Sequence, residues 1–547
     1  MISSIQNAST TTASTITTYS KAILTPEELK TFVANNKWSI RLATLAMALY
    51  LMYGKVTKPP AQLRHIPHLP FHSFFKAHLQ QKSAAQIAEE TTLPAALASA
   101  HGLYLRCDTL GWSVRANRPE IIKVLLMNKY LFPKAAISKE NRKGTLYGRT
   151  LIGPNVGFST GDQWKKQRQV LNPAFARSMP VKALGRLSQT MINVIEAQIG
   201  ADGNELLDLY DIAHRWALDA LCVSLLGFDF KALEDRNNPW VTRYKFILSV
   251  GSKQRFFAFP FMEQYCWFLF PDIRRAHDVV TIFQNMLRNI VNQKREALLR
   301  NKDTFKTSSK AEEQEKDIVT SMVEAEMEGQ GRLTDEELQS NFSLFFMVGH
   351  ESTASTASFA MYYFAKHQDV QQRAREEAIR IFGDGFDIIP TLEQTSKLDY
   401  LNMVIKETLR IMPPAVTTIA RIATEDTELS GVFIPKGTRV AVDVFELQRN
   451  PQVWKNPDVF DPERFAPGGE AEELSKTGLP WVPFSSGSRQ CIGLNFSMIE
   501  LRVLLPMLLR KFEWSVPENS IHKDKLVIEG LGVIRPKNLM LSFKKRY

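Results

Sequence analysis

The chain has 547 residues, 44% of them hydrophobic and 23% charged, a globular composition whose length alone allows about three or four domains. The formal net charge of +11 favours acidic partners or anionic lipid headgroups, but no basic run interleaved with aromatic residues indicates nucleic-acid binding. The four cysteines are widely spaced and form no CxxC pair. This spacing excludes a disulfide framework and a cysteine-based structural zinc site, and it indicates a reducing compartment.

The N-terminal region is predicted to hold three different segments. Residues 1–35 are a polar segment rich in serine and threonine, with a weak glycosylation sequon at Asn7 and a short helix predicted from Thr25. Residues 36–54 contain the apolar stretch Trp38–Gly54, which is rich in Leu, Ala, Met and Tyr and is broken only by Arg41. Its length lies near the short limit, about 17 residues, for a bilayer span. We predict a single membrane anchor there, with a buried core helix as the alternative. Residues 55–74 are rich in proline and histidine and are predicted to be a stiff linker.

The rest of the chain, residues 75–547, predicts a mainly α fold with small β-sheets, an α+β class. Period-2 patterns predict β-hairpins at 100–115, 429–442 and 526–543. A capping box at Thr334 predicts a buried helix of about thirty residues that crosses the centre of the protein.

The middle of this long helix contains polar residues that are costly in a buried helix: Gly349, Glu351, Ser352 and Thr353. Gly349 could let a flat group approach the backbone, and Glu351 could relay protons with a neighbouring hydroxyl. The alternative is a helix that packs closely against its neighbours through small residues. The segment alone favours neither reading.

Three further motifs carry charged or nucleophilic side chains. Trp164 and Arg168 lie on one helical face and could bind a carboxylate, or belong to a solvated basic helix. Glu407, Arg410 and Arg464 are predicted to form a buried structural charge network. A glycine-rich turn before a helix at residues 494–504 contains one cysteine, whose thiolate could be a nucleophile, a metal ligand or neither. The residues of that turn are Phe484, Gly487, Arg489, Cys491 and Gly493.

In this order, the motifs resemble those of the cytochrome P-450 superfamily of haem-thiolate monooxygenases, of the membrane-bound eukaryotic (microsomal) type, fungal members included. The resemblance implies that residues 75–547 form one domain, with the long helix over haem b and the cysteine loop beneath it. It assigns Cys491 as the iron ligand and Glu351, Ser352 and Thr353 as catalytic residues. The residues implied to bind the cofactor are Trp164, Arg168, Gly349, Arg421, Phe484, Gly487, Arg489, Cys491 and Gly493.

Two positions depart from the family pattern. Ser352 stands where most members have threonine, so its hydroxyl is less rigidly held and coupling efficiency is in question. Gln368 replaces a proline after the long helix, so a less sharply defined helix end is expected.

The resemblance also implies partners and a location. It implies O2, an NADPH-dependent diflavin reductase that docks near Lys165 and Lys166, cytochrome b5 as an optional donor, and the endoplasmic reticulum membrane with a cytosolic catalytic domain. The aromatic segment 255–270 could meet lipid or belong to the core. The implied activity is hydroxylation of a hydrophobic steroid, fatty acid, terpenoid or xenobiotic. The alternatives are a reductase-independent isomerase or dehydratase of an oxygenated lipid, and a non-catalytic haem or ligand-binding protein.

Overall fold

The structure is a computed structural model, and it divides the chain into two compact units, Met1–Ala61 and Gln62–Tyr547. It describes residues 35–80, 82–108, 110–135, 142–177, 179–199, 205–251, 253, 256, 259–300, 315–329, 331–385, 387–530 and 532–546. The predicted sequon at Asn7 and the start of the predicted helix at Thr25 lie outside these residues. Residues 75–547, predicted as one catalytic domain, lie within the second unit, and the boundary between the units falls inside the predicted linker.

The described part of the first unit is built on the helix α3, Lys37–Thr57. It covers the predicted anchor and continues three residues past its expected end at 54. Throughout the described residues, no helix combines the length and the apolarity that a membrane crossing requires. Basic residues such as Lys37 and Arg41 lower the apolarity of α3, so the prediction of a spanning anchor is not supported.

The second unit contains several small β-sheets, which confirms the predicted fold class. The first predicted hairpin is confirmed as antiparallel β1 (Leu103–Asp108) and β2 (Gly111–Ala116). The other two predicted hairpins are only partly correct, since each region divides its strands between two sheets. The sheets, with strands in spatial order, are β1-β2-β7-β4 with β7 at Arg439–Val442 and β4 at Arg421–Ile422; β3-β11-β8 at Glu205–Asp208, Met540–Lys545 and Phe512–Ser515; β5-β6 at Thr427–Leu429 and Val432–Ile434; and β10-β9 at Arg535–Pro536 and Ile528–Glu529.

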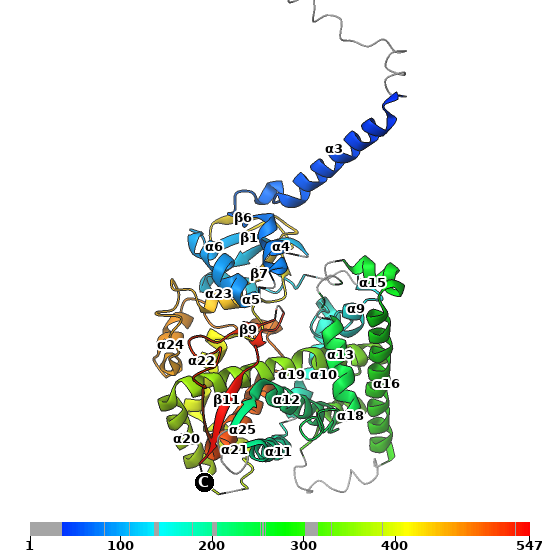
Figure 1. The fold of residues 1–547 in the computed structure, drawn as a ribbon. Helices are drawn as coiled ribbons and strands as arrows, with labels where there is room; N and C mark the ends of the chain where they lie inside the picture. The colour runs from blue at the N-terminus through cyan, green and yellow to red at the C-terminus, as the bar shows by residue number, and fades with distance from the viewer. Residues whose placement is uncertain are drawn as a thin grey trace, which may run out of the picture. The chain divides into compact units, whose positions relative to one another are not determined.

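Helices make up most of the second unit (Figure 1). The predicted linker ends earlier than expected, because a helix already begins at Phe71. The α-helices are α4 Phe71–Leu79, α5 Ala84–Ile87, α6 Leu93–Ala98, α7 Pro119–Met127, α9 Leu146–Thr150, α10 Gly161–Arg177, α11 Val181–Ile199, α12 Leu209–Leu226, α13 Pro239–Gly251, α15 Pro260–Cys266, α16 Pro271–Arg300, α18 Ile318–Met327, α19 Asp335–Lys366, α20 Gln368–Phe382, α21 Leu392–Ser396, α22 Asp399–Ile411, α23 Val444–Gln448, α24 Glu470–Ser475 and α25 Leu494–Lys511. Shorter turns are η1 Ala61–Leu63, η2 Ala88–Thr92, η3 Trp267–Leu269, η4 Pro462–Phe465 and η5 Gly487–Arg489.

The helix α19 is the long central helix that the sequence predicts. It begins at the Thr334–Glu337 capping box, in which each side chain accepts a hydrogen bond from the other residue's backbone N–H. It then crosses the second unit and packs against α12, α22 and α25 (Figure 1). Its C-terminal half, from Ala354 to Ala365, is buried in the largest apolar core of the protein.

The end of α19 is more sharply defined than the missing proline suggests. The side chain of Gln368 donates hydrogen bonds to the carbonyls of Ala365, at 2.9 Å, and of Trp514, at 3.0 Å. It thereby satisfies a backbone acceptor that the helix end leaves unpaired. The Gln368 amide therefore ends α19 by hydrogen bonding, whereas proline would end it by restricting the backbone. The next helix, α20, begins at Gln368 itself.

Candidate active site

Cys491 lies between η5 and the first turn of α25, in the loop that the sequence predicts for it. Its backbone N–H donates to the carbonyl of Phe484 at 2.9 Å, and its sulfur accepts a hydrogen bond from the backbone of Gly493. Burial raises the pKa of the thiol, although the Gly493 hydrogen bond and nearby basic side chains oppose the shift. Part of the residue's surface is nevertheless uncovered, so the sulfur can reach a ligand.

The turn before Cys491 requires glycine. Gly487 adopts a φ of +70°, and a Cβ at this position would lie 2.9 Å from the carbonyl oxygen of Leu126. Gly493 has an ordinary φ of −85°, and the nearest atom to a Cβ there would be the Cys491 sulfur, at 3.9 Å. The first glycine therefore fixes the loop conformation, whereas the second leaves space beside the sulfur.

Four basic side chains gather next to this loop. Arg168 comes from α10, Arg421 from β4 and Arg489 from η5, as the sequence predicts, and Lys134 pairs with Arg421 as an isolated β-bridge. Burial and then the neighbouring positive charges of Arg489, Arg421 and Arg168 lower the pKa of Lys134 to about 7. Burial also lowers the pKa of Arg421 and of Arg489 to about 10. Within the described residues, no ion pair joins any of the four to an acidic side chain. Together they favour a buried group with more than one negative charge.

Several donors in this cluster are buried without a partner among the described residues. They are Trp164 Nε1, Arg168 Nε and Arg489 Nη1. Arg489 lies with its guanidinium 4.0 Å from the centre of the Trp164 ring and donates to the Ser159 carbonyl at 2.8 Å. Arg168 donates to the Gln490 carbonyl, which ties α10 to the cysteine loop. Because unpaired buried donors are costly, these atoms would fit the two propionates of a haem held through Cys491.

Lys134 was not identified from the sequence, and its removal provides a test of this cluster. In Lys134→Gln, we expect haem to dissociate about tenfold faster, because a charged hydrogen bond contributes roughly 1.5–3 kcal/mol. The measurement is the rate of haem transfer to a scavenger protein. Lys165→Gln is the matched control, since Lys165 is exposed and pairs with Asp162 at 2.9 Å. Equal haem dissociation rates in the two variants would contradict the assignment.

On α19, Gly349 faces another helix. A Cβ at Gly349 would lie 3.0 Å from Leu221 Cδ1 of α12. This contact supports the alternative that the sequence left open, in which small residues let helices pack closely. The neighbouring Val348 is 44% exposed, although most of the helix is buried, so an apolar surface remains uncovered one turn before Ser352.

The two hydroxyl residues of α19 have different partners. Ser352 is half-buried and donates to the Val348 carbonyl at 2.8 Å. Thr353 is buried and donates to Glu500 Oε2 of α25 at 2.9 Å, with the Gly349 carbonyl at 3.1 Å. Thr353 thus links α19 to α25, and its hydroxyl is less available than that of Ser352.

Glu500 gives the protein a predictable pH dependence. Burial raises its pKa to about 8 from an ordinary value of 4.5, although the Thr353 hydrogen bond lowers it. In the folded protein Glu500 therefore keeps a proton that it loses above about pH 4.5 in the unfolded chain. The stability that this protonated carboxyl group contributes is lost as the pH rises through about 8. In Glu500→Gln, we expect the free energy of unfolding to fall less steeply over this range, by about 1.4 kcal/mol per pH unit. Urea unfolding at pH 5.5, 6.5 and 7.5 tests this, and parallel curves would contradict it.

Glu351 precedes Ser352 in the same turn of α19. Burial raises the pKa of its carboxyl group, and the nearby Arg535 of β10 opposes the shift. The closest approach between them, from Arg535 Nη1 to Glu351 Oε1, is 3.9 Å. Such a loosely paired carboxyl group next to a hydroxyl can hold and pass on a proton.

The predicted charge network is assembled as three buried residues. Arg410 binds Glu407 through two hydrogen bonds of 2.7 and 2.8 Å, and both side chains are fully buried. Arg464 Nε lies 3.5 Å from Glu407 Oε1, and the backbone N–H of Asp461 donates to the same oxygen at 2.9 Å. The network joins α22 to η4, away from the cations at Cys491, which suits a structural role.

The described aromatic residues around α15 are mostly exposed rather than buried in the core. Phe256 is buried, whereas Arg255, Phe257 and Ala258 lie outside the described residues. The exposed side chains are Phe259, Phe261, Tyr265, Trp267, Phe268 and Leu269.

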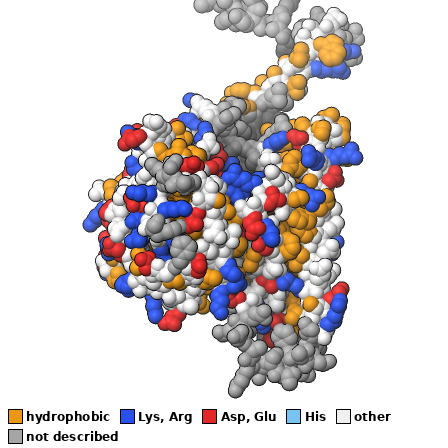
Figure 2. Space-filling model, turned by 60° about the horizontal axis from the view of Figure 1, so that its bottom comes forward, with side chains coloured by type: hydrophobic (Ala, Val, Ile, Leu, Met, Phe, Trp, Pro, Cys, Tyr) orange, Lys and Arg blue, Asp and Glu red, His pale blue; other side chains and the backbone are white. Residues whose placement is uncertain are grey.

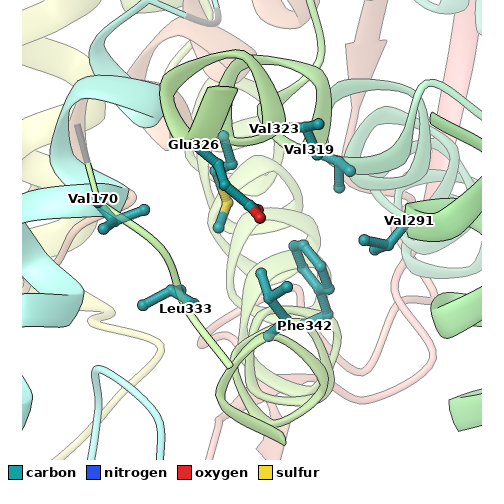
Figure 3. Close-up of a pocket in the computed structure, with 10 residues that line it drawn as sticks. Val170, Val291, Val319, Val323, Glu326, Leu333 and Phe342 are labelled. Carbon is teal, nitrogen blue, oxygen red and sulfur yellow. The ribbon is translucent and has the colours of Figure 1, made fainter. Parts of the chain in front are cut away.

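One apolar cavity lies between α10, α16, α18 and α19 (Figure 3). Val170, Val291 and Phe342 are among its lining residues, and the Glu326 carboxylate reaches toward its centre. That carboxylate is paired with Arg295 at 3.1 Å. None of the predicted site residues lines this cavity, so it is distinct from the predicted site at Cys491.

Comparison with known proteins shows the family to which the chain belongs. The chain is 28% identical over 501 residues to human cytochrome P450 4F3, which covers 90% of this chain and 92% of that protein. It is 27% identical over 440 residues to cytochrome P450 3A12 of the dog, covering 78% of this chain and 82% of that protein. The crystal structure of the cytochrome P450DA haem domain has the same fold, with a TM-score of 0.69 at 22% identity, over 88% of this chain and 98% of that one. The cytochrome P450 family model matches residues 113–543. The chain therefore belongs to the cytochrome P450 family and is a haem b-binding monooxygenase.

Proposed function

We propose that the enzyme uses O2 and electrons delivered from NADPH by a diflavin reductase to hydroxylate a hydrophobic small molecule. The observation that carries this proposal is the set of four basic side chains beside Cys491, of which Arg421 and Arg489 are buried and the other two half-buried. Its unpaired donors fit two haem propionates. The acid and the hydroxyl at Glu351 and Ser352 add a means of proton delivery. A non-catalytic haem protein would not need such a pair.

Different residues of the chain are proposed to ligate the iron, to bind the propionates and to exclude water from the sulfur. Haem bound through Cys491 supplies the activation of O2. Trp164, Arg168 and Arg489 bind its propionates, together with Lys134 and Arg421. Phe484 packs between the cysteine loop and the apolar core and limits the access of water to the sulfur.

Glu351 and Ser352 supply protons on the α19 side. Ser352 holds a hydroxyl at the uncovered face of α19, and Glu351 returns protons to it from the Arg535 side. Thr353 keeps this turn in place through Glu500. We assign Ser352 as the working hydroxyl because the Thr353 hydroxyl is buried and bonded to a carboxyl group.

The substrate is proposed to be apolar. Val348 of α19 is exposed inside a largely buried helix, and Ile419, in the segment before β4, is 37% exposed. These uncovered side chains suit a steroid, fatty acid, terpenoid or xenobiotic, which binds mainly through apolar contacts.

The membrane and the reductase belong to the same proposal. The exposed aromatic side chains of α15 and η3 form an apolar patch that suits contact with the endoplasmic reticulum membrane, beside a cytosolic catalytic domain. Lys165 and Lys166 are partly neutralised by Asp162 and Glu337. Docking of a reductase or cytochrome b5 at these lysines would therefore depend on local pairs. On the face of the molecule shown in Figure 2, basic and acidic side chains are interspersed.

A two-step experiment tests the proposal. The reduced protein is first treated with carbon monoxide, and the Soret band is expected to show the red shift typical of thiolate-ligated haem. NADPH consumption and products are then measured with a diflavin reductase and a panel of lipids. Hydroxylated product that requires NADPH supports the proposal. Rearranged product without NADPH would favour the isomerase alternative, and no product with any oxygenated or reduced lipid would favour a binding protein.

Replacement of Ser352 tests the proton-delivery assignment. Ser352→Ala is expected to lower product formed per NADPH consumed by about tenfold, because proton transfer by a positioned group contributes roughly 10²–10⁴-fold and water substitutes in part. The measurement is the ratio of product to NADPH, with released peroxide measured alongside. Ser352→Thr is the control and should preserve the ratio. If Ser352→Ala left the ratio unchanged, the hydroxyl would have to come from elsewhere.

A further inference from the structure

Two histidines and a carboxylate lie close together where α12 packs against the turn of α19 that carries the proposed proton-delivery pair. His350 and Glu351 are neighbours on α19, and His214 comes from α12. One ligand atom from each of the three side chains lies within 4.8 Å of the other two. Both histidines are buried, and Glu351 is half-buried.

The hydrogen bonding of His350 leaves a buried nitrogen without a partner. His350 Nδ1 lies 2.9 Å from the carbonyl oxygen of Phe346, which can only accept, so Nδ1 carries the proton. Nε2 then has a free lone pair, and it has no hydrogen-bond partner among the described residues although the side chain is 1% exposed. A histidine that donates one ring N–H to a backbone carbonyl and offers the other nitrogen is the usual form of a metal-ligating histidine.

Aromatic contacts bring the two imidazoles close together. The His214 and His350 rings meet edge to face, with centroids 4.9 Å apart, and Tyr244 contacts His350 in the same way at 4.9 Å. Burial lowers the pKa of both histidines, to about 4 for His214, so each imidazole is neutral and able to ligate at physiological pH.

The charges near the cluster include one cation that a metal ion would displace. Arg535 approaches Glu351 only to 3.9 Å, and it also donates to Glu529 at 2.9 Å on the more exposed side. Arg535 can therefore keep Glu529 as its partner when Glu351 turns away. Lys245 and Arg215 lie close enough to His214 to disfavour added positive charge, which limits the affinity expected for the site.

We propose that His214, His350 and Glu351 bind a divalent transition-metal ion, for which Zn2+ is the probe, with water as the fourth ligand. Two imidazoles and one carboxylate with an open position are a known tetrahedral zinc set. Metal–ligand distances of about 2.0–2.2 Å place neighbouring ligand atoms roughly 3.3 Å apart. The three ligand atoms would therefore have to move closer together by up to about 1.5 Å, which side-chain rotation can provide.

Metal binding would slow turnover, a consequence that rests on the proposed role of Glu351. A carboxylate bound to zinc cannot accept and release protons near neutral pH, so Ser352 would lose its supply. The three proposed ligands lie on α12 and α19 and not on the cysteine loop, so the thiolate-type spectrum is expected to stay unchanged.

The experiment measures metal binding separately from activity. The full-length holoenzyme is dialysed against buffered zinc, and zinc per haem iron is determined by elemental analysis. One zinc per haem is expected, with affinity lowered at least about a hundredfold in His214→Gln and in His350→Gln, because each loses a ligand. His72→Gln, which changes an exposed histidine, is the matched control and should bind as the parent does. Unchanged affinity in both ligand variants would overturn the site.

Two further readouts keep the outcomes distinct. Zinc-edge X-ray absorption of the parent holoenzyme should show two imidazole ligands and oxygen, and a spectrum without imidazole would overturn the site even if the variants fail to fold. Zinc should lower NADPH-driven product formation at least about tenfold, and much less in His214→Gln. Binding without inhibition would overturn the regulatory part alone, whereas a missing thiolate Soret band without zinc would mean failure of the proposed function instead.

Discussion

In Cys491→Ser, the carbonyl complex of the reduced protein is expected to lose its red-shifted Soret band, and product formation to fall at least about a thousandfold. The thiolate donates electron density to the iron and so favours cleavage of the O–O bond, whereas a serine hydroxyl is a poor donor. A thousandfold loss corresponds to about 4 kcal/mol in the activation barrier. Haem can still be retained, because the basic cluster that fits its propionates does not include the sulfur.

A matched cysteine variant separates ligand loss from general damage. Cys266 of α15 is a free, half-buried cysteine, so Cys266→Ser should retain the parent spectrum and activity. Haem content is measured for both variants by extraction, and spectra are compared at equal haem. A thiolate-type spectrum in Cys491→Ser would show that another residue ligates the iron.

In Glu407→Ala, the free energy of unfolding is expected to fall by roughly 3–5 kcal/mol, enough to remove much of the stability of a typical domain. The substitution leaves the fully buried Arg410 guanidinium without its carboxylate. Three carbonyl contacts remain, and they cannot neutralise the charge. They come from Gln448 and Pro457, both at 2.8 Å, and from Val459 at 3.3 Å. Arg464 loses a partner as well, although it keeps Glu470.

Urea unfolding of the holoprotein, followed by tryptophan fluorescence and by the Soret band, measures this loss. Glu393→Ala is the control, since Glu393 and Lys397 form an exposed pair at 2.6 Å whose removal should leave the stability nearly unchanged. Arg410→Lys should restore little, because an ammonium group cannot make both hydrogen bonds to Glu407. A Glu407→Ala protein as stable as the control would show that the buried pair contributes nothing net.

Local sequence signals were sufficient where one segment determines its own structure. The capping box at Thr334 and the apolar run after it predicted α19, and the glycines around Cys491 predicted a turn before a helix. Trp164 and Arg168 could be placed on one face from their spacing alone.

Local sequence signals were not sufficient where the structure depends on contacts between distant segments of the chain. Lys134 is one lysine in a loop, and only its pairing with Arg421 brings it to the cations near Cys491. The partner of Thr353 lies on α25, so no local pattern could show that Thr353 bonds to Glu500 while Ser352 stays accessible. The β7 strand was predicted to belong to a hairpin, yet it pairs with β2 in parallel, because strand partners depend on tertiary packing rather than on propensity.

The origin of the four cations in separate parts of the chain bears on the order of events during synthesis. Lys134, Arg168 and Arg421 leave the ribosome well before Arg489 and Cys491, and N-terminal segments generally fold first. Until the cysteine loop emerges, no thiolate is present to ligate the iron of a haem held between the early cations. The iron can therefore gain its thiolate ligand only when nearly the whole catalytic unit has been made, and the yield of thiolate-ligated enzyme should follow the haem supply at that moment.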